Sequence, residues 1–216
     1  MLEQYKTIIK QGQNEIIEKK SRFIATVCPV KTEEEAKVFI DETKKKYWNA
    51  THNVFAYQIG EHNEIQRFSD DGEPQGTAGM PVLDVLQREE IKNAVVVVTR
   101  YFGGTLLGTG GLVRAYGKAA KEGLIASGIC EVILYKKFYV TVSYTNSGKV
   151  QYEILQNGYE LYDTLYTENV TYVVLVKWQQ SDFFLKKMID ITGNNVEIKE
   201  EETFYGTWID NKLEVI

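Results

Sequence analysis

The segment from residue 94 to residue 127 constrains the fold of this chain most strongly. It begins with Ala94–Arg100, a valine-rich run that is apolar at nearly every position. Such a run predicts a strand that is buried on both faces. The glycine-rich stretch Gly103–Gly111 follows, and Leu112–Ser127 then repeats apolar residues at helical spacing up to Gly128. The segment therefore predicts a buried sheet that is covered by helices.

Strand and helix patterns alternate through the rest of the first half. Strands are expected at residues 15–20, 22–27, 51–59 and 65–68, and helices at residues 32–46 and 82–87. Thr32 followed by Glu35 is typical of a capping box at the start of the first helix. The stretch 69–81 is rich in glycine and proline and is expected to form turns, although its helix could begin as early as Thr77.

The second half has a different rhythm. Strands are expected at residues 138–144, 159–167, 169–176 and 196–204, with helices at residues 147–156 and 182–191. This βαββαβ order is typical of a ferredoxin-like domain, in which two helices cover one face of an antiparallel sheet. We therefore predict an α+β chain of two domains, residues 1–135 and residues 136–216.

Several classes of protein are disfavoured by simple patterns. No apolar run approaches the roughly 20 residues that a membrane helix needs, and the charged start of the chain is unlike a signal peptide. Cys28 and Cys130 lie far apart and form no CxxC pair, so we expect two reduced thiols. These observations predict a cytoplasmic protein with no membrane, metal or cofactor requirement.

Charge is balanced overall but uneven locally. Residues 1–135 carry 17 Lys and Arg against 18 Asp and Glu, and residues 136–216 carry 8 against 12, so neither half is typical of a general nucleic-acid binder. Residues 91–121 nevertheless contain five cations and no acid, just after the acidic cluster Asp70, Asp71 and Glu73. Adjacent fields of opposite sign favour a functional surface within residues 47–117.

The glycine stretch is the strongest candidate for ligand binding. Arg100 precedes it and Arg114 follows it, and two guanidinium groups near the free N–H groups of a helix start would suit a phosphate or carboxylate. No Lys-Ser/Thr pair follows the last glycine, so this is not a Walker A motif. A tight turn with close helix–strand packing is the structural alternative. The candidate phosphate- or nucleic-acid-binding residues are Arg100, Tyr101, Phe102, Gly103, Gly104, Gly108, Gly110, Gly111, Arg114, Tyr116 and Lys118.

A further candidate site comprises His52, Asp70, Asp71, Glu73 and Thr77. The three carboxylates could hold a hard cation, or His52 could act as a general base beside Asp70 or Asp71. Helix capping by Asp70 or Asp71, a salt bridge to Arg100 or Arg114, and a hydrogen-bonded strand histidine are the structural alternatives. Catalytic residues are not identifiable from these patterns.

Three ordered motifs resemble the IMPACT (YigZ-type) family. They are Tyr47–Asn53, Asp70–Pro81 and Thr99–Tyr116, and the Ser21–Ala25 segment fits as well. The resemblance covers about residues 15–128, and the second half is similar to the C-terminal domain of bacterial members, which resembles a domain of elongation factor G. It implies that the first domain has a fold like the second domain of a small-subunit ribosomal protein.

The same resemblance implies a link to translation. Eukaryotic members are translational regulators that act by protein–protein contact in a stress-kinase pathway. We expect this chain to lack their N-terminal partner-binding domain and to carry the ferredoxin-like domain instead.

Three functions follow from these patterns. The first is a nucleic-acid- or ribosome-associated module with phosphate contacts from Arg100, Arg114 and Lys118, and with Tyr101, Phe102 and Tyr116 available for stacking. The second is a small-molecule phosphate- or nucleotide-binding enzyme that uses the same loop with Asp70, Asp71 or Glu73. The third is a protein-interaction regulator that binds no nucleic acid. RNA, the ribosome or a regulatory protein is the expected partner.

Overall fold

The computed structural model describes residues 1–210 and 212–216, which form two compact units. The first unit consists of Met1 and residues 5–131, and the second of residues 2–4 and 132–216. Each is built from helices packed on an antiparallel sheet, which confirms the expected α+β class. The expected boundary after Tyr135 lies inside strand β7 (Ile129–Val142), which passes between the units without a linker.

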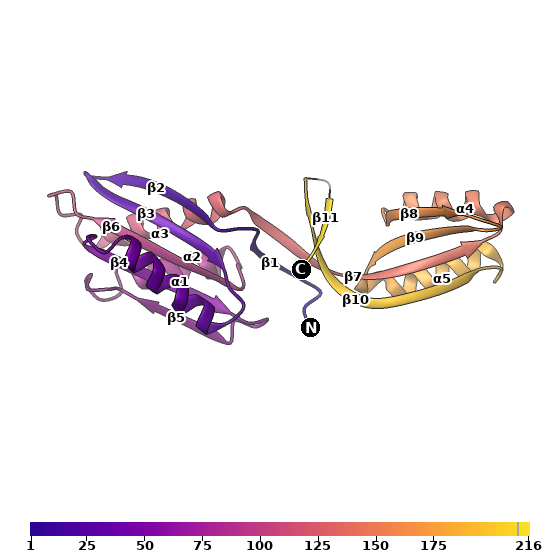
Figure 1. Cartoon of the computed structure of the whole chain (residues 1–216), viewed down its shortest axis with the longest axis horizontal. Coiled ribbons are helices and arrows are strands. Elements are labelled where there is room, and N and C mark those ends of the chain that lie inside the picture. The colour runs from indigo at the N-terminus through magenta and orange to yellow at the C-terminus, as the bar shows by residue number, and fades with distance from the viewer. Residues whose placement is uncertain (211) are drawn as a thin grey trace. The chain divides into compact units, whose positions relative to one another are not determined.

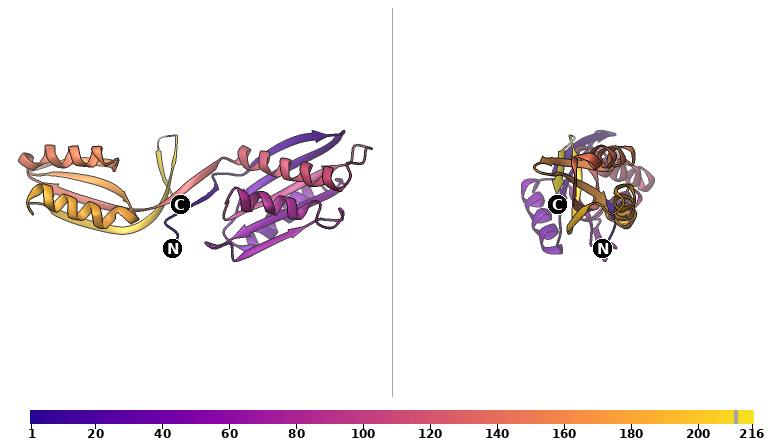
Figure 2. Two further views of the ribbon diagram at one scale, coloured as in Figure 1. Left: turned by 180° about the vertical axis from the view of Figure 1, so that it is seen from behind. Right: turned by 90° about the vertical axis from the view of Figure 1, so that its right-hand side faces the viewer.

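The sheet of the first unit has the strand order β2-β3-β6-β4-β5, and the pairings along it are antiparallel. Its strands are β2 (Gly12–Glu18), β3 (Ser21–Pro29), β4 (His52–Ile59), β5 (Ile65–Ser69) and β6 (Ala94–Tyr101). Its helices are α1 (Glu33–Lys46), α2 (Gly79–Arg88) and α3 (Thr109–Ser127). Helix α1 covers one face of the sheet, while α2 and α3 cover the other (Figures 1 and 2).

The valine run explains this layered arrangement. In β6 the side chains of Val96 and Val98 enter the core beneath α2 and α3, whereas Val95 and Val97 enter the core beneath α1. A strand buried on both faces must be apolar at nearly every position, as the sequence of β6 is. At the start of α1, the Thr32 hydroxyl accepts a hydrogen bond from the Glu35 N–H, as the capping pattern predicts.

The second unit has the predicted ferredoxin-like order. Its elements are β7, α4 (Tyr144–Gln156), β8 (Glu160–Tyr166), β9 (Val170–Lys177), α5 (Ser181–Thr192) and β10 (Glu197–Ile209). The strand order β10-β7-β9-β8 places the first and third strands in the centre, and both helices lie on one face (Figure 2). A short 3₁₀ turn, Trp178–Gln180, precedes α5.

Several features differ from the sequence-based expectation. Strands β1 (Gln4–Ile8) and β11 (Lys212–Val215) were not predicted, and β7 begins well before the expected Phe138. Strands β1 and β11 pair with β7 and β10 respectively, so long-range pairing rather than local pattern creates them. Helix α3 begins at Thr109 instead of Leu112, because glycine lowers helix propensity without preventing a helical first turn.

Candidate functional site

Four loops meet at one end of the sheet in the first unit. The strand register brings them together, because Arg22 pairs with Tyr101 and His52 pairs with Arg100. The loops are residues 19–20, 47–51, 70–78 and 102–108, and we call this region the loop end. The three motifs singled out in the sequence, which lie far apart along the chain, therefore meet in space.

A buried carboxylate, Glu73, lies at the centre of the loop end. Its Oε1 atom accepts a hydrogen bond from Arg100 Nη1 at 2.5 Å and another from the Tyr116 hydroxyl at 2.7 Å. Glu73 is 8% exposed, Arg100 is 5% exposed and Tyr116 is fully buried. Burial, together with the Glu73 carboxylate, raises the pKa of Tyr116 well above its usual range, so this hydroxyl remains a donor.

Aromatic rings hold the Arg100 guanidinium in place. Its central carbon lies 5.3 Å from the centre of the Phe23 ring and 5.6 Å from that of Phe102. The Ser21 hydroxyl accepts a hydrogen bond from Arg100 Nη2 at 3.4 Å and from the Gly103 N–H at 3.1 Å. The Arg100 Nε atom has no hydrogen-bond partner within the described part of the chain. Arg100 thus joins β3, β6 and the loop that follows β6.

His52 faces this cluster from the start of β4. Its Nδ1 lies 2.7 Å from the Asp71 carbonyl oxygen, which can only accept, so Nδ1 carries the proton. Its Nε2 lies 3.8 Å from Glu73 Oε1. The sequence placed His52 beside Asp70 or Asp71. His52 does lie beside Asp71, but it contacts the Asp71 carbonyl oxygen, whereas the Asp71 carboxylate binds Lys44 Nζ and the Asn53 N–H.

The remaining acidic residue, Asp70, has a structural role. Its carboxylate accepts hydrogen bonds from the backbone N–H groups of Gly76, Ala78 and Gly79 at 2.8 to 3.1 Å. Because these groups precede or begin α2, Asp70 satisfies donors that a helix start leaves free. The Thr77 hydroxyl donates to the Pro74 carbonyl in the same turn. The capping interpretation therefore holds for Asp70, and Glu73 rather than Asp70 or Asp71 forms the salt bridge to Arg100.

The glycine stretch is shorter and more structural than its sequence indicates. Gly110 and Gly111 lie in the first turn of α3, and Gly108 precedes the helix with a φ of 74°. A Cβ atom on Gly103 would lie 2.0 Å from the Lys20 backbone, so Gly103 permits a close chain approach. Gly104 also has a positive φ, 79°, in open space. Gly104 and Gly108 therefore permit turns of the backbone, and Gly103 permits close packing against a neighbouring strand end.

Exposed cations line the neighbouring face of α3. Arg114, Lys118 and Lys121 are spaced by four and three residues, which puts them on one side of the helix. They border a groove of about 460 Å³ between α2 and α3, and Arg88 lies on its α2 side. Lys121 is paired with Glu89 at 2.9 Å, whereas Arg88, Arg114 and Lys118 have no ion pair within the described residues. Asp84 and Glu89 also line the groove.

A second hollow adjoins the same cations. It has a volume of about 250 Å³ and is bordered by Lys19, Leu107, Arg114 and Lys118, together with Glu18. The first turn of α3 contains no acidic residue, and no side chain caps it. The partial positive charge at this helix start is therefore not neutralised by an acidic residue of the helix itself.

Burial changes the predicted set of binding residues. Arg100 and Tyr116 are buried and bonded to Glu73, so neither presents its polar group to a phosphate or a base at the surface. Arg114, Lys118 and Phe102 are exposed, and Tyr101 is half-buried with its hydroxyl bonded to Asn49. No local pattern singles out Arg88 as a site residue, whereas Lys121 could have been selected from its helical spacing of seven residues from Arg114.

The described residues include no group of three or more His, Cys, Asp or Glu side chains arranged to hold a metal ion. In the same part of the chain, none of the helices has the length and apolarity required to span a bilayer.

The comparisons with known proteins agree with the motifs at the loop end. The Impact N-terminal domain family matches residues 19–124, and the Domain of unknown function (DUF1949) family matches residues 140–195. The chain is 44% identical to the IMPACT family member YvyE of Bacillus subtilis over 205 residues, which is 95% of this chain and 94% of YvyE. The chain belongs to the IMPACT family.

Other relatives match parts or all of the chain. The IMPACT family member YigZ of Escherichia coli is 44% identical over 108 residues, 49% of this chain and 53% of YigZ. A solved structure described as a crystal structure of a hypothetical protein covers 94% of this chain and 99% of its own length, with 27% identity and a TM-score of 0.58. Membership of the YigZ-type family, inferred from the motifs, is thereby confirmed.

Proposed function

We propose that this IMPACT-family chain binds nucleic acid, with phosphate groups held along the exposed face of α3. The observation that carries the proposal is the cationic side of the α2–α3 groove, formed by Arg88, Arg114, Lys118 and Lys121. Nucleic-acid affinity depends strongly on such phosphate contacts. We further propose that this surface serves translation, on RNA or on the ribosome, as the family resemblance implies.

The start of α3 supports this proposal. Its first turn is free of acidic residues, and its N–H groups add a partial positive charge near Arg114. The exposed cations lie on a rigid helix that packs on the sheet, with Leu112, Ala115 and Ala119 in the core. A helix that is already folded holds phosphate-binding side chains at a defined spacing, so binding does not have to order the backbone.

The geometry gives less support to an enzyme built on the acidic cluster. Asp70 caps α2, Asp71 holds Lys44 and the β4 backbone, and Glu73 is paired with Arg100. Each carboxylate thus has a protein partner that explains its position. A protein-only regulator would use the same exposed surface, and the experiment below separates it from a nucleic-acid binder.

The test is a fluorescence-anisotropy titration of labelled single-stranded and duplex RNA and DNA at several salt concentrations. Three groove cations have no ion pair within the described residues, so a single strand that contacts all three should give a log–log salt slope of roughly −2. Raising salt from about 50 to about 200 mM would then weaken binding about 18-fold.

The informative variant is Arg114→Gln/Lys118→Gln. Because it removes two of these three contacts, the same salt change should weaken its binding only about 3-fold. The matched control is Lys186→Gln/Lys212→Gln, which removes two exposed cations of the second unit and should bind like wild type. Absence of wild-type binding at low salt, or equal losses in both variants, would refute the proposal.

A further inference from the structure

Three large apolar side chains project from the loop end. Trp48 is 82% exposed on the loop between α1 and β4, and Phe102 and Leu106 are 47% and 82% exposed on the loop between β6 and α3. A single exposed apolar side chain is ordinary, but grouped ones on adjoining loops indicate a binding surface. None of the three contributes to the cores of the first unit.

The two loops are fastened to each other. The Thr51 N–H donates to the Arg100 carbonyl at 2.9 Å, and the Phe102 N–H donates to the Thr51 hydroxyl at 3.1 Å. The Tyr101 hydroxyl donates to the Asn49 side-chain oxygen at 2.9 Å. These bonds hold the backbone on both sides of the exposed rings, so a ligand would not have to order it.

The buried cluster supports the Phe102 ring directly. The Arg100 guanidinium lies 5.6 Å from the ring centre, and Glu73 and the Phe23 ring fix the guanidinium in turn. Phe102 is nonetheless almost half exposed. The buried Arg100–Glu73 ion pair thus packs beneath the exposed Phe102 ring and helps to fix its position.

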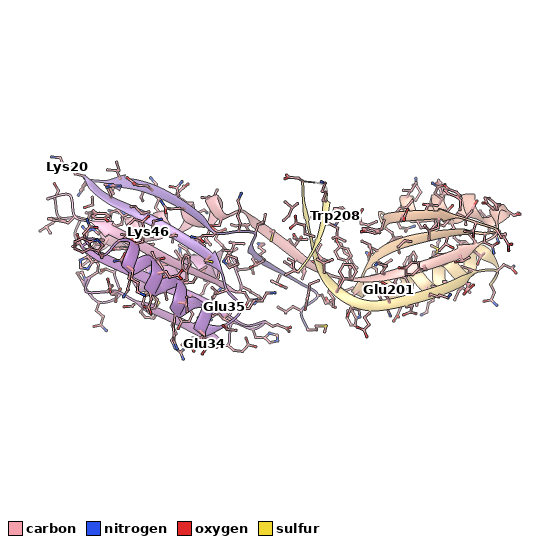
Figure 3. The ribbon with its side chains drawn as sticks, in the orientation of Figure 1. Lys20, Glu34, Glu35, Lys46, Glu201 and Trp208 are labelled. Carbon is pink, nitrogen blue, oxygen red and sulfur yellow. The ribbon has the colours of Figure 1, made fainter. Side chains whose placement is uncertain are left out.

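Exposed cations lie on other parts of the loop end and beside it. Lys19, Lys20, Lys45 and Lys46 are exposed on the β2–β3 turn and at the end of α1. Figure 3 shows Lys20 and Lys46 toward the same end of the first unit, with Glu34 and Glu35 at the other end of α1. Arg114 and Lys118 border the adjoining hollow with Lys19. Rings flanked by lysines and arginines complement a polyanion whose bases are free to stack.

We propose that the loop end binds single-stranded nucleic acid, with unpaired bases stacked on Trp48 and Phe102 and the backbone phosphates on the exposed cations. This inference rests on the proposed function and narrows its ligand to single strands. A duplex keeps its bases stacked inside, so it could use the cations but not the rings. The site therefore discriminates by ring stacking, whereas α3 contributes attraction to phosphate in either form.

The test compares Trp48→Ala and Phe102→Ala with wild type on a labelled oligonucleotide, offered as a single strand and as its duplex. Loss of one stacked base should weaken single-strand binding by about 5- to about 150-fold in each variant. The salt slope should not change, because no charge is removed. Trp48→Phe and Phe102→Tyr, which retain a ring, should recover most of the affinity.

Matched controls are Trp178→Ala and Phe183→Ala, which remove exposed rings of the second unit and should leave binding unchanged. If both loop-end alanine variants bind like these controls while Arg114→Gln/Lys118→Gln loses affinity, the inference is overturned and the proposed function stands. Equal affinity of wild type for duplex and single strand would also overturn it. Competition by polyglutamate or by anionic vesicles as effective as that by the oligonucleotide would show a general anion-binding surface and overturn it too.

No binding of any oligonucleotide by wild type at low salt would overturn both proposals together. Circular dichroism of each variant separates a local loss of stacking from unfolding. Trp48→Phe and Phe102→Tyr keep the test decisive, because each retains an aromatic ring for stacking at the substituted position.

Discussion

Removing the charge of Glu73 should destabilise the first unit severely. In the Glu73→Gln variant, Arg100 keeps its positive charge at 5% exposure but loses its only anionic partner within hydrogen-bond distance among the described residues. The Tyr116 hydroxyl also exchanges a charged acceptor for a neutral one. The variant therefore leaves a buried charge without compensation.

The magnitude follows from the burial of the pair. Breaking a buried ion pair by removing one partner costs about 3–5 kcal/mol. Whole domains are stable by only about 5–15 kcal/mol, so this single substitution would remove a large share of the stability of the first unit. Replacing the whole cluster in the variant Glu73→Leu/Arg100→Met/Tyr116→Phe should recover most of the loss, because no buried polar group is then left alone.

Hydrogen–deuterium exchange of peptides from β6 and α3 measures this effect in the intact chain. Slow amides there report the opening free energy of the first unit, independently of the second unit. Urea unfolding followed by circular dichroism gives a second reading. The control is Glu89→Gln, which breaks the solvent-exposed pair with Lys121 and should change exchange little, because water screens that pair.

A loss below about 1 kcal/mol in Glu73→Gln, comparable to that of an exposed pair, would refute the reasoning. Such a small loss would mean that water reaches Arg100 and that the Glu73, Arg100 and Tyr116 cluster does not hold the loop end rigidly. Failure of the apolar triple variant to recover stability would show instead that the polar cluster specifies the local fold.

Three further effects follow from the same unit. Asp70→Ala should lower the free energy of unfolding by about 0.5–2 kcal/mol, because the N–H groups at the start of α2 lose their acceptor, and the urea midpoint should fall. Asp70→Asn, which keeps an acceptor oxygen, should lose less stability. Gly103→Ala should lower the melting temperature, because a Cβ would lie 2.0 Å from backbone, whereas Gly110→Ala in open space should not. The pKa of Tyr116 is raised in the folded chain, so the contribution of this residue to the free energy of unfolding is fully present below about pH 10. That contribution falls as the pH rises further, because the unfolded chain then releases the tyrosine proton while the folded chain keeps it. Urea midpoints between pH 9 and pH 11 should therefore fall less steeply in Tyr116→Phe; an equal slope would contradict this assignment.

Some of the candidate site could be read from the sequence, and some could not. The sequence pattern assigned Arg100 and Tyr116 to a phosphate-binding site and Glu73 to a separate acidic site, whereas the structure joins all three in one buried cluster. The reason is that a cation on a strand and a tyrosine on a helix carry no local sign of burial. Only the register of β4 against β6 places His52 and Arg100 side by side.

The sequence by itself determined most of the helices and strands, but not the edge strands β1 and β11. The continuous valine run required a strand with two covered faces, and the βαββαβ pattern required a ferredoxin-like second unit, because hydrophobic periodicity is a local property. The tertiary structure alone decided which polar groups are buried and which residues face solvent together. Strand pairing and helix packing bring distant residues such as Trp48 and Phe102 onto adjoining loops, and no local pattern encodes that proximity.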